Sequence, residues 1–155
     1  MLDLFEEFKA LISTLSERNI SYALCGGLAM AVYGVQRATV DIDLLIETED
    51  LEKASATARS MGYTIEAQPM TCSGGAIEIR LLSKLAPGAE DVLMLDMLLV
   101  TPQIQKVWES REEIEWEGGR LWVVSRAGLI ALKSLRRSNQ DIDDIKRLQE
   151  GNYES

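Results

Sequence analysis

An acidic pair lies inside a run of apolar and β-branched residues, and this run limits what the chain can fold into. Residues 39–46 read TVDIDLLI, so Asp41 and Asp43 interrupt a segment that otherwise has the composition of a buried strand. Successive side chains of a strand alternate between its two faces, which places both carboxylates on one face, about 6.5–7 Å apart. Two like charges this close raise each other's proton affinity unless a cation compensates them. We therefore expect a core strand whose acidic face binds a cation.

A second apolar run carries one more acid. Residues 92–100 read VLMLDMLLV, and a lone carboxylate such as Asp96 is costly to bury there unless it is paired or bound to a metal. Two such strands can together build a three-carboxylate site for Mg²⁺ or Mn²⁺, because Mg²⁺ prefers oxygen ligands. The alternatives are a solvated strand end for Asp41 and Asp43, and an Asp96 satisfied by backbone N–H groups or by an arginine.

The composition excludes several classes of site. The chain has no histidine, which removes Ser-His-Asp and Cys-His catalysis and makes a zinc site improbable. Its net charge of −9 argues against a protein that binds nucleic acid along its whole surface. No apolar run approaches the roughly 18 residues that a membrane helix needs, and the acidic N-terminus is unlike a signal peptide. We expect a cytoplasmic protein with no membrane association.

The remaining patterns predict one α+β domain over residues 1–150, followed by a frayed tail at residues 151–155. Amphipathic or Ala-rich segments predict helices at residues 2–18, 28–33, 50–61, 102–108, 125–135 and 140–149. Apolar or alternating segments predict strands at residues 22–25, 39–46, 63–66, 76–82, 92–100, 112–117 and 120–124. The last two flank Gly118-Gly119, a two-residue hairpin turn. We expect a mixed β-sheet flanked by helices, with two helices at the C-terminal end.

A glycine pair, Gly26-Gly27, lies between the first predicted strand and a short helix. Glycine allows the backbone to approach a ligand closely, and the start of the following helix offers N–H groups to a phosphate. A simple turn is the alternative for such a pair taken alone. Its position, with residues 28–40 between it and the acidic strand, indicates that one triphosphate can contact both.

These motifs together resemble a known signature. The stretch Cys25-Gly26-Gly27, followed by Arg37-Ala38-Thr39-Val40-Asp41-Ile42-Asp43, is similar to that of the polymerase-β-like nucleotidyltransferase superfamily. Its small bacterial members are the most similar, among them the toxin-type (AbiEii-like) proteins and the antibiotic nucleotidyltransferases. The resemblance is specific over residues 25–43 and looser for the third acid and the C-terminal helices. It implies a nucleotidyltransferase-like fold, an NTP substrate and a divalent cation.

By this resemblance, Gly26 and Gly27 contact the nucleotide phosphates. Asp41 and Asp43 hold Mg²⁺ or Mn²⁺, and Asp96 either completes the metal site or acts as the base on the attacking hydroxyl. Gly27 stands where many members of the superfamily have serine. A hydroxyl contact to phosphate is therefore absent at this position.

Two cations are candidates for binding the triphosphate. Arg37 precedes the acidic strand, and Lys133 lies in the predicted helix 125–135, where it resembles the later lysine of toxin-type members. Their alternatives are a surface arginine and a helical lysine that balances local acids. A second D-x-D, formed by Asp141 and Asp143, is rejected as a metal site, since a helix turns 100° per residue and separates the two acids. The helix dipole explains acids in a first turn.

The resemblance implies transfer of a nucleoside monophosphate from an NTP to a hydroxyl-type acceptor, with release of pyrophosphate. The acceptor could be an RNA end, a protein side chain or a small molecule, and the net charge of −9 disfavours a long nucleic acid unless a partner supplies cations. One alternative is a catalytically weak nucleotide- or partner-binding module of a toxin–antitoxin-like pair. Another is a phosphotransferase that uses the γ-phosphate.

Overall fold

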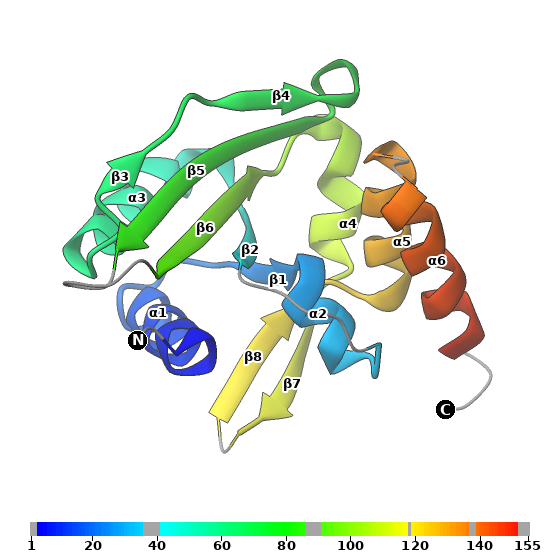
Figure 1. Ribbon diagram of the computed structural model, residues 1–155, viewed down its shortest axis with the longest axis horizontal. Helices are drawn as coiled ribbons and strands as arrows, with labels where there is room; N and C mark the ends of the chain where they lie inside the picture. Colours follow the sequence, from blue (N-terminus) through cyan, green and yellow to red (C-terminus); the bar gives the residue numbers. More distant parts are fainter. Residues whose placement is uncertain (1–2, 36–40, 86–90, 118, 137–138, 152–155) are drawn as a thin grey trace.

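The computed structural model describes residues 3–35, 41–85, 91–117, 119–136 and 139–151, and it contains a mixed sheet flanked by helices (Figure 1). The strands are β1 (Ala23–Cys25), β2 (Asp41–Ile46), β3 (Ile65–Glu66), β4 (Met70–Cys72), β5 (Ile77–Leu85), β6 (Val92–Leu99), β7 (Glu112–Trp116) and β8 (Gly119–Val123). The helices are α1 (Leu4–Glu17), α2 (Gly26–Val32), α3 (Leu51–Ser60), α4 (Gln105–Glu109), α5 (Arg126–Arg136) and α6 (Asn139–Gly151). The predicted α+β class is confirmed.

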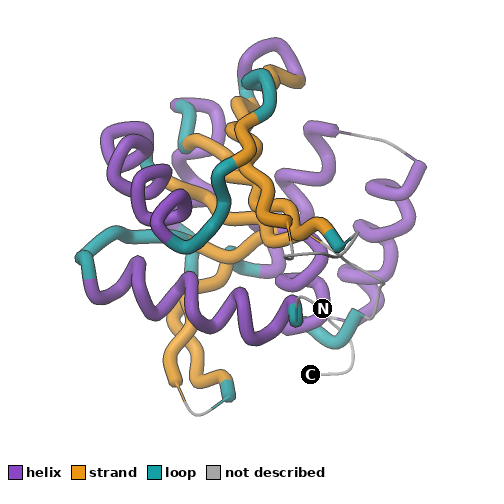
Figure 2. The backbone as a smooth tube through the Cα atoms, turned by 60° about the vertical axis from the view of Figure 1, so that its left-hand side comes forward, coloured by secondary structure: helices purple, strands orange, loops and turns teal. Residues whose placement is uncertain are grey.

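The sheet has eight strands, in the order β3-β5-β6-β2-β1-β8-β7, with β4 paired to β5 outside this path. Its central pair, β2 and β6, is parallel, and β1 runs antiparallel to β2. Parallel strands need a long crossover connection, and here that crossover contains α3 and the antiparallel strands β3 to β5. Figure 2 shows the strands running through the middle of the molecule with helices on both sides.

One face of β2 belongs to the hydrophobic core. Ile42 and Leu44 are buried together with the apolar stripe of α1, which includes Phe8, Leu11 and Leu15. The helix α1 packs against β2 and also against α3. Because the side chains of a strand alternate, the acids of β2 are left on the opposite face, toward the C-terminal helices.

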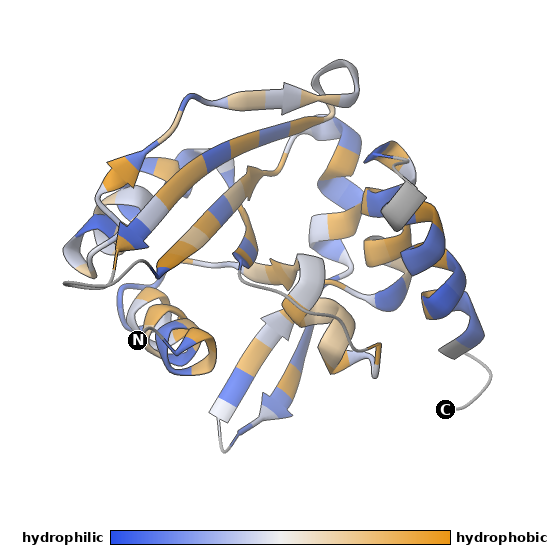
Figure 3. Ribbon diagram, in the orientation of Figure 1, coloured by the Kyte–Doolittle hydropathy of each residue, from blue (hydrophilic) through white to orange (hydrophobic). Residues whose placement is uncertain are grey.

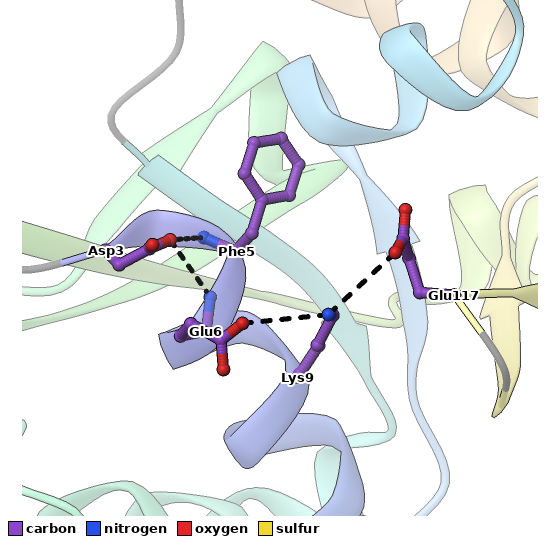
Figure 4. A network of polar contacts seen from close by, with 5 residues as sticks. All are labelled: Asp3, Phe5, Glu6, Lys9 and Glu117. Atoms are coloured by element: carbon purple, nitrogen blue, oxygen red, sulfur yellow. Dashed lines mark hydrogen bonds and ion pairs between the residues drawn. The ribbon is translucent and has the colours of Figure 1, made fainter.

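The start of α1 follows from its capping residue (Figure 4). The Oδ1 atom of Asp3 accepts hydrogen bonds from the backbone N–H groups of Phe5, at 3.0 Å, and Glu6, at 3.2 Å. Such a cap satisfies N–H groups that have no partner within the helix. One turn later, Lys9 Nζ lies 3.7 Å from Glu6 and 3.9 Å from Glu117, which links α1 to the β7–β8 hairpin. These exposed ion pairs contribute little to stability, so packing fixes the position of α1.

The C-terminal helices α5 and α6 pack side by side, and apolar and polar residues alternate along both of them (Figures 1 and 3). The hydroxyl of Ser125, directly before α5, accepts a hydrogen bond from the N–H of Gly128 at 3.0 Å, as a helix-capping residue does. None of the helices in the described ranges is long and apolar enough to cross a membrane.

The structure differs from the sequence-based expectation in several details. A short strand, β4, lies between the predicted strands 63–66 and 76–82, directly after Pro69, and its three residues give no strand pattern of their own. The helix α2 begins at Gly26 rather than at residue 28, and α4 follows a 3₁₀ turn at Pro102–Ile104. Residues 39–40 of the predicted acidic strand, the turn residue Gly118 and residues 152–155 of the predicted tail lie outside the described residues.

Candidate functional site

Three carboxylates on two neighbouring strands share one face of the sheet. The register of the parallel pair β2–β6 sets Asp43 directly beside Asp96. Asp41 lies two residues before Asp43 on the same strand, so it projects on the same side. The sequence predicted this grouping from two separate apolar runs, and the strand pairing places all three acids together.

Asp43 and Asp96 interact through a hydrogen bond, and burial favours the protonated form of both. The pKa of Asp43 is raised to about 8, mainly by burial and further by the negative charge of Asp96, the hydrogen bond with Asp96 and the charge of Asp41, while Arg136 opposes the shift. Burial is also the main cause that raises the pKa of Asp96, and the hydrogen bond with Asp43 lowers it. The two carboxyls therefore share a hydrogen bond that needs a proton on one of them. Burial likewise raises the pKa of Asp41.

The arrangement fits a cation that binds oxygen ligands. The Oδ1 atom of Asp96 is buried and has no hydrogen-bond partner among the described residues. A buried carboxylate oxygen beside two further acids is suited to a hard divalent cation. Within the described ranges, no three acidic, histidine or cysteine side chains are already spaced as a ligand set. The strand register nevertheless puts the three acids on one face of β2 and β6.

We expect the metal-free protein to lose stability as the pH rises from about 4 to about 8. An unfolded aspartate titrates near about 3.9, whereas Asp43 in the folded protein, surrounded by Asp41, Asp96 and Arg136, titrates at about 8. Between these values the folded state binds more protons than the unfolded state, so the free energy of unfolding falls with rising pH. Thermal denaturation from pH 4 to 8 without divalent cations measures this slope.

Two variants make the pH experiment specific. Asp43→Asn should remove most of the decrease, whereas Asp143→Asn, at an exposed position of α6, should leave it unchanged. Mg²⁺ should raise the melting temperature of the unmodified protein more at pH 8 than at pH 5, because it competes with the proton for the same oxygens. An equal pH slope in both variants would contradict the protonation of Asp43.

The turn after β1 lies directly against Asp43. The backbone of Gly26 has φ of +69°, and a Cβ atom placed there would lie 2.7 Å from the Cβ of Asp43 and nearer still to its carboxylate. Every residue except glycine would therefore displace the acid. The predicted Gly26-Gly27 turn and the predicted acidic strand thus belong to one site.

Lys133 lies buried between α5 and α6, and only 9% of its side chain is exposed. Its Nζ is 3.0 Å from Oδ2 of Asp144 and 3.7 Å from Oδ1 of Asp141. The same Asp141 approaches Arg136 Nε at 3.8 Å through its other oxygen. Lys133 therefore balances local acids, which is the alternative that the sequence left open for it. These two acids also hold its side chain in place.

Sequence reasoning missed the role of these acids. Asp141 and Asp143 do point to different faces of α6, since Asp141 is buried and Asp143 is exposed. The helix dipole alone, however, does not account for Asp141 and Asp144, both of which are buried against Lys133. Their spacing of three residues, which puts two side chains on one helix face, was the available signal.

A cavity of about 160 Å³ opens beside the carboxylates. Its polar end is formed by residues from β1, α2, β2, β6 and α5, namely Cys25, Gly26, Asp43, Asp96, Lys133 and Arg136. The structure thus brings four of the predicted residues to one cavity, and it places Asp41 and Gly27 next to them in the chain. Arg37 lies outside the described residues.

Comparison with known proteins matches most of the chain to one family. Residues 10–143 match the model of a family described as nucleotidyl transferase AbiEii toxin, type IV TA system. None of the curated proteins matches the chain in sequence.

Solved structures share its fold at low sequence identity. Lincosamide antibiotic adenylyltransferase LnuA, bound to lincomycin, is 17% identical with a TM-score of 0.63, over 93% of this chain and 95% of that one. ANT(2'')-Ia in complex with adenylyl-2''-tobramycin is 17% identical with a TM-score of 0.61, over 91% and 84%. A Thermotoga maritima protein assigned as a nucleotidyltransferase is 14% identical with a TM-score of 0.65, over 97% and 93%.

Proposed function

This chain belongs to the AbiEii nucleotidyl transferase family, and from that membership we propose that it is a metal-dependent enzyme that moves a nucleoside monophosphate from an NTP to a hydroxyl acceptor. The observation that carries the proposal is the strand register that sets Asp43 beside Asp96, with Asp41 on the same face. A buried oxygen of Asp96 without a hydrogen-bond partner among the described residues supports cation binding there. In this proposal Asp41 and Asp43 are the principal ligands of Mg²⁺ or Mn²⁺.

The bound cation would neutralise charge on the phosphates and orient the α-phosphate. Asp96 has two roles open to it, a third ligand of the cation or the general base. Its pairing with Leu81 of β5 sets it next to the apolar end of the cavity, so we assign it the role of the base. Burial raises the pKa of Asp96, which favours a carboxylate that takes up a proton. The acceptor oxygen forms a bond to the α-phosphorus, its proton passes to Asp96, and the bond to the β-phosphate oxygen breaks to release pyrophosphate.

The triphosphate would lie along the turn of Gly26 and Gly27, where the close approach of backbone to Asp43 brings phosphate and cation together. Lys133 reaches the same cavity from α5, and its two acidic partners hold its position. Arg37 remains a proposed phosphate ligand on sequence grounds, just before β2. All four residues keep the roles that the resemblance implies.

The acceptor is proposed to be a small molecule. Two of the similar structures are named for such acceptors, one as a lincosamide antibiotic adenylyltransferase and the other with adenylyl-2''-tobramycin. The net charge of −9 further disfavours a long nucleic acid. The family description also names a type IV toxin–antitoxin system, so we propose a cognate protein partner as well.

Label transfer tests the reaction itself. With Mg²⁺ and a cell extract as the source of acceptor, we expect label from the α-phosphate of one of the four NTPs to reach the acceptor, with pyrophosphate as the other product. Transfer of γ-label would instead show a phosphotransferase. Transfer of neither label, with retained NTP binding by equilibrium dialysis, would favour a binding module of the toxin–antitoxin type. The variant Asp143→Asn, which changes an exposed acid of the second D-x-D, is the matched control for variants at the proposed site and should transfer the label as the unmodified protein does.

A further inference from the structure

We propose that the cavity beside Asp43 and Asp96 binds the acceptor, and that this acceptor is a small uncharged alcohol or phenol with an apolar group the size of one ring. The inference rests on the proposed function and narrows its acceptor class. It comes from the walls of the cavity, which are polar at one end and apolar over the remainder.

The apolar walls come from two sides, the sheet and the helix α5. On the sheet side, Ile77, Ile79 and Leu81 occupy alternate positions of β5, and Leu98 lies two residues beyond Asp96 on β6. On the helix side, Leu129 and Leu132 precede Lys133 and Arg136 on one face of α5. Side chains of this kind normally close against each other in a core. Here they enclose free volume that adjoins the carboxylates.

The register of the sheet connects the apolar end to the acids. Leu81 of β5 pairs with Asp96 of β6, and Ile79 pairs with Leu98. A ligand whose hydroxyl lies at Asp96 would therefore place its next few atoms over Leu81 and Leu98. This arrangement matches an amphipathic molecule with one hydroxyl end and one apolar end.

The size of the cavity sets the size of the apolar group. A volume of about 160 Å³ is close to that of an engineered apolar cavity that binds benzene, about 150 Å³. Met70, which pairs with Ile79 across β4 and β5, lines the same cavity and is 46% exposed. An unbranched methionine at such an edge adapts to ligands of different shape.

The charges around the cavity disfavour a cationic acceptor. Among its described lining residues the only acids are Asp43 and Asp96, which the proposed reaction already uses. The other charged groups are Lys133 and Arg136, whose positive charges repel an amine. Both are paired with acids of α6, so they do not create a strong anion site either. An uncharged acceptor therefore fits best.

Ring-alcohol binding by the Mg²⁺-loaded protein without NTP tests the cavity independently of catalysis, because the bound cation then offsets the charges of Asp43 and Asp96. In NMR titrations, we expect benzyl alcohol to bind, and benzylamine, with the same ring and a positive charge, to bind at least about tenfold more weakly. Ile79→Phe fills the cavity from a half-buried position and should weaken benzyl alcohol binding by about tenfold or more. Ile65→Phe is the matched control, because Ile65 is exposed on β3 and does not line the cavity.

A second variant guards against misfolding of the first. Met70→Trp narrows the cavity from an exposed position and should give the same loss. Equal affinity of benzyl alcohol for all variants, or tighter binding of benzylamine, would overturn the proposal.

Nucleotide binding separates this proposal from the reaction on which it rests. By equilibrium dialysis, Ile79→Phe should keep its affinity for Mg²⁺ and NTP, while α-label transfer to the acceptor falls at least about tenfold. Loss of NTP affinity in Ile79→Phe would assign the cavity to the nucleotide and overturn its assignment to the acceptor. If the unmodified protein transfers no α-label, the proposed reaction fails. The ligand cavity would still be established if the protein binds benzyl alcohol and Ile79→Phe removes that binding.

Discussion

Replacing Asp43 by asparagine is expected to lower kcat/KM for nucleotidyl transfer by about three orders of magnitude or more. The variant lacks one proposed carboxylate ligand of the cation, and the transition state of the transfer then loses several kcal/mol of stabilisation. Asp43 is the acid at which all parts of the site meet. It lies beside Asp96 in the sheet, against the turn at Gly26 and at the cavity wall. Steady-state rates of α-label transfer measure the effect.

The same substitution should leave the fold intact. Asparagine has nearly the shape of aspartic acid and removes a buried charge that repels Asp41 and Asp96, so the metal-free variant should be at least as stable as the unmodified protein at pH 8. Asp143→Asn should retain full activity. An Asp43→Asn enzyme with more than a tenth of normal activity would exclude Asp43 as a metal ligand.

Replacing Lys133 by alanine is expected to destabilise the protein by about 3–5 kcal/mol, because it removes the cation from a buried ion pair with Asp141 and Asp144. Arg136 approaches Asp141 but is itself exposed over more than half of its side chain, so it replaces little of the loss. Urea denaturation at neutral pH measures the change. Lys146→Ala, at an exposed position of the partner helix, should cost no more than about 0.5 kcal/mol.

The stability effect of Lys133 must be separated from its proposed contact with phosphate. Lys133→Ala combined with Asp144→Asn should recover part of the lost stability, since it also removes the buried charge that lies nearest to the lysine. The double variant should still bind NTP more weakly than the unmodified protein. A loss below 1 kcal/mol in Lys133→Ala would show that the two acids are neutralised in another way.

The part of the site that sequence could predict rests on short-range patterns. Asp41 and Asp43 share a strand face by alternation alone, and Asp96 is conspicuous because it is the one charged residue of its apolar run. The Gly26-Gly27 turn is visible from its place between a strand and a helix. Each of these inferences needs only the period of a strand or the conformational range of glycine.

The remainder depends on contacts between segments that are far apart in the chain. The spacing of Asp141 and Asp144 identifies a shared helix face but gives no indication that Lys133 of a different helix is buried between them. The strand β4 forms because β5 offers it a free edge, and its own three residues carry no strand pattern. The cavity depends on the distance between β5 and α5, which a single segment cannot specify.

The parallel pairing of β2 and β6 has a consequence for the order in which the protein can become active. Asp43 is made long before Asp96, and the chain between them contains α3 and β3 to β5. While the ribosome is still synthesising this crossover, β2 can pair with β1, but the position beside Asp43 stays vacant. Non-local pairing of this kind is slow to form, because the chain entropy of the crossover must be lost first. A nascent or truncated chain that ends before β6 therefore presents Asp41 and Asp43 without Asp96, and the three-acid face exists only after β6 has paired with β2.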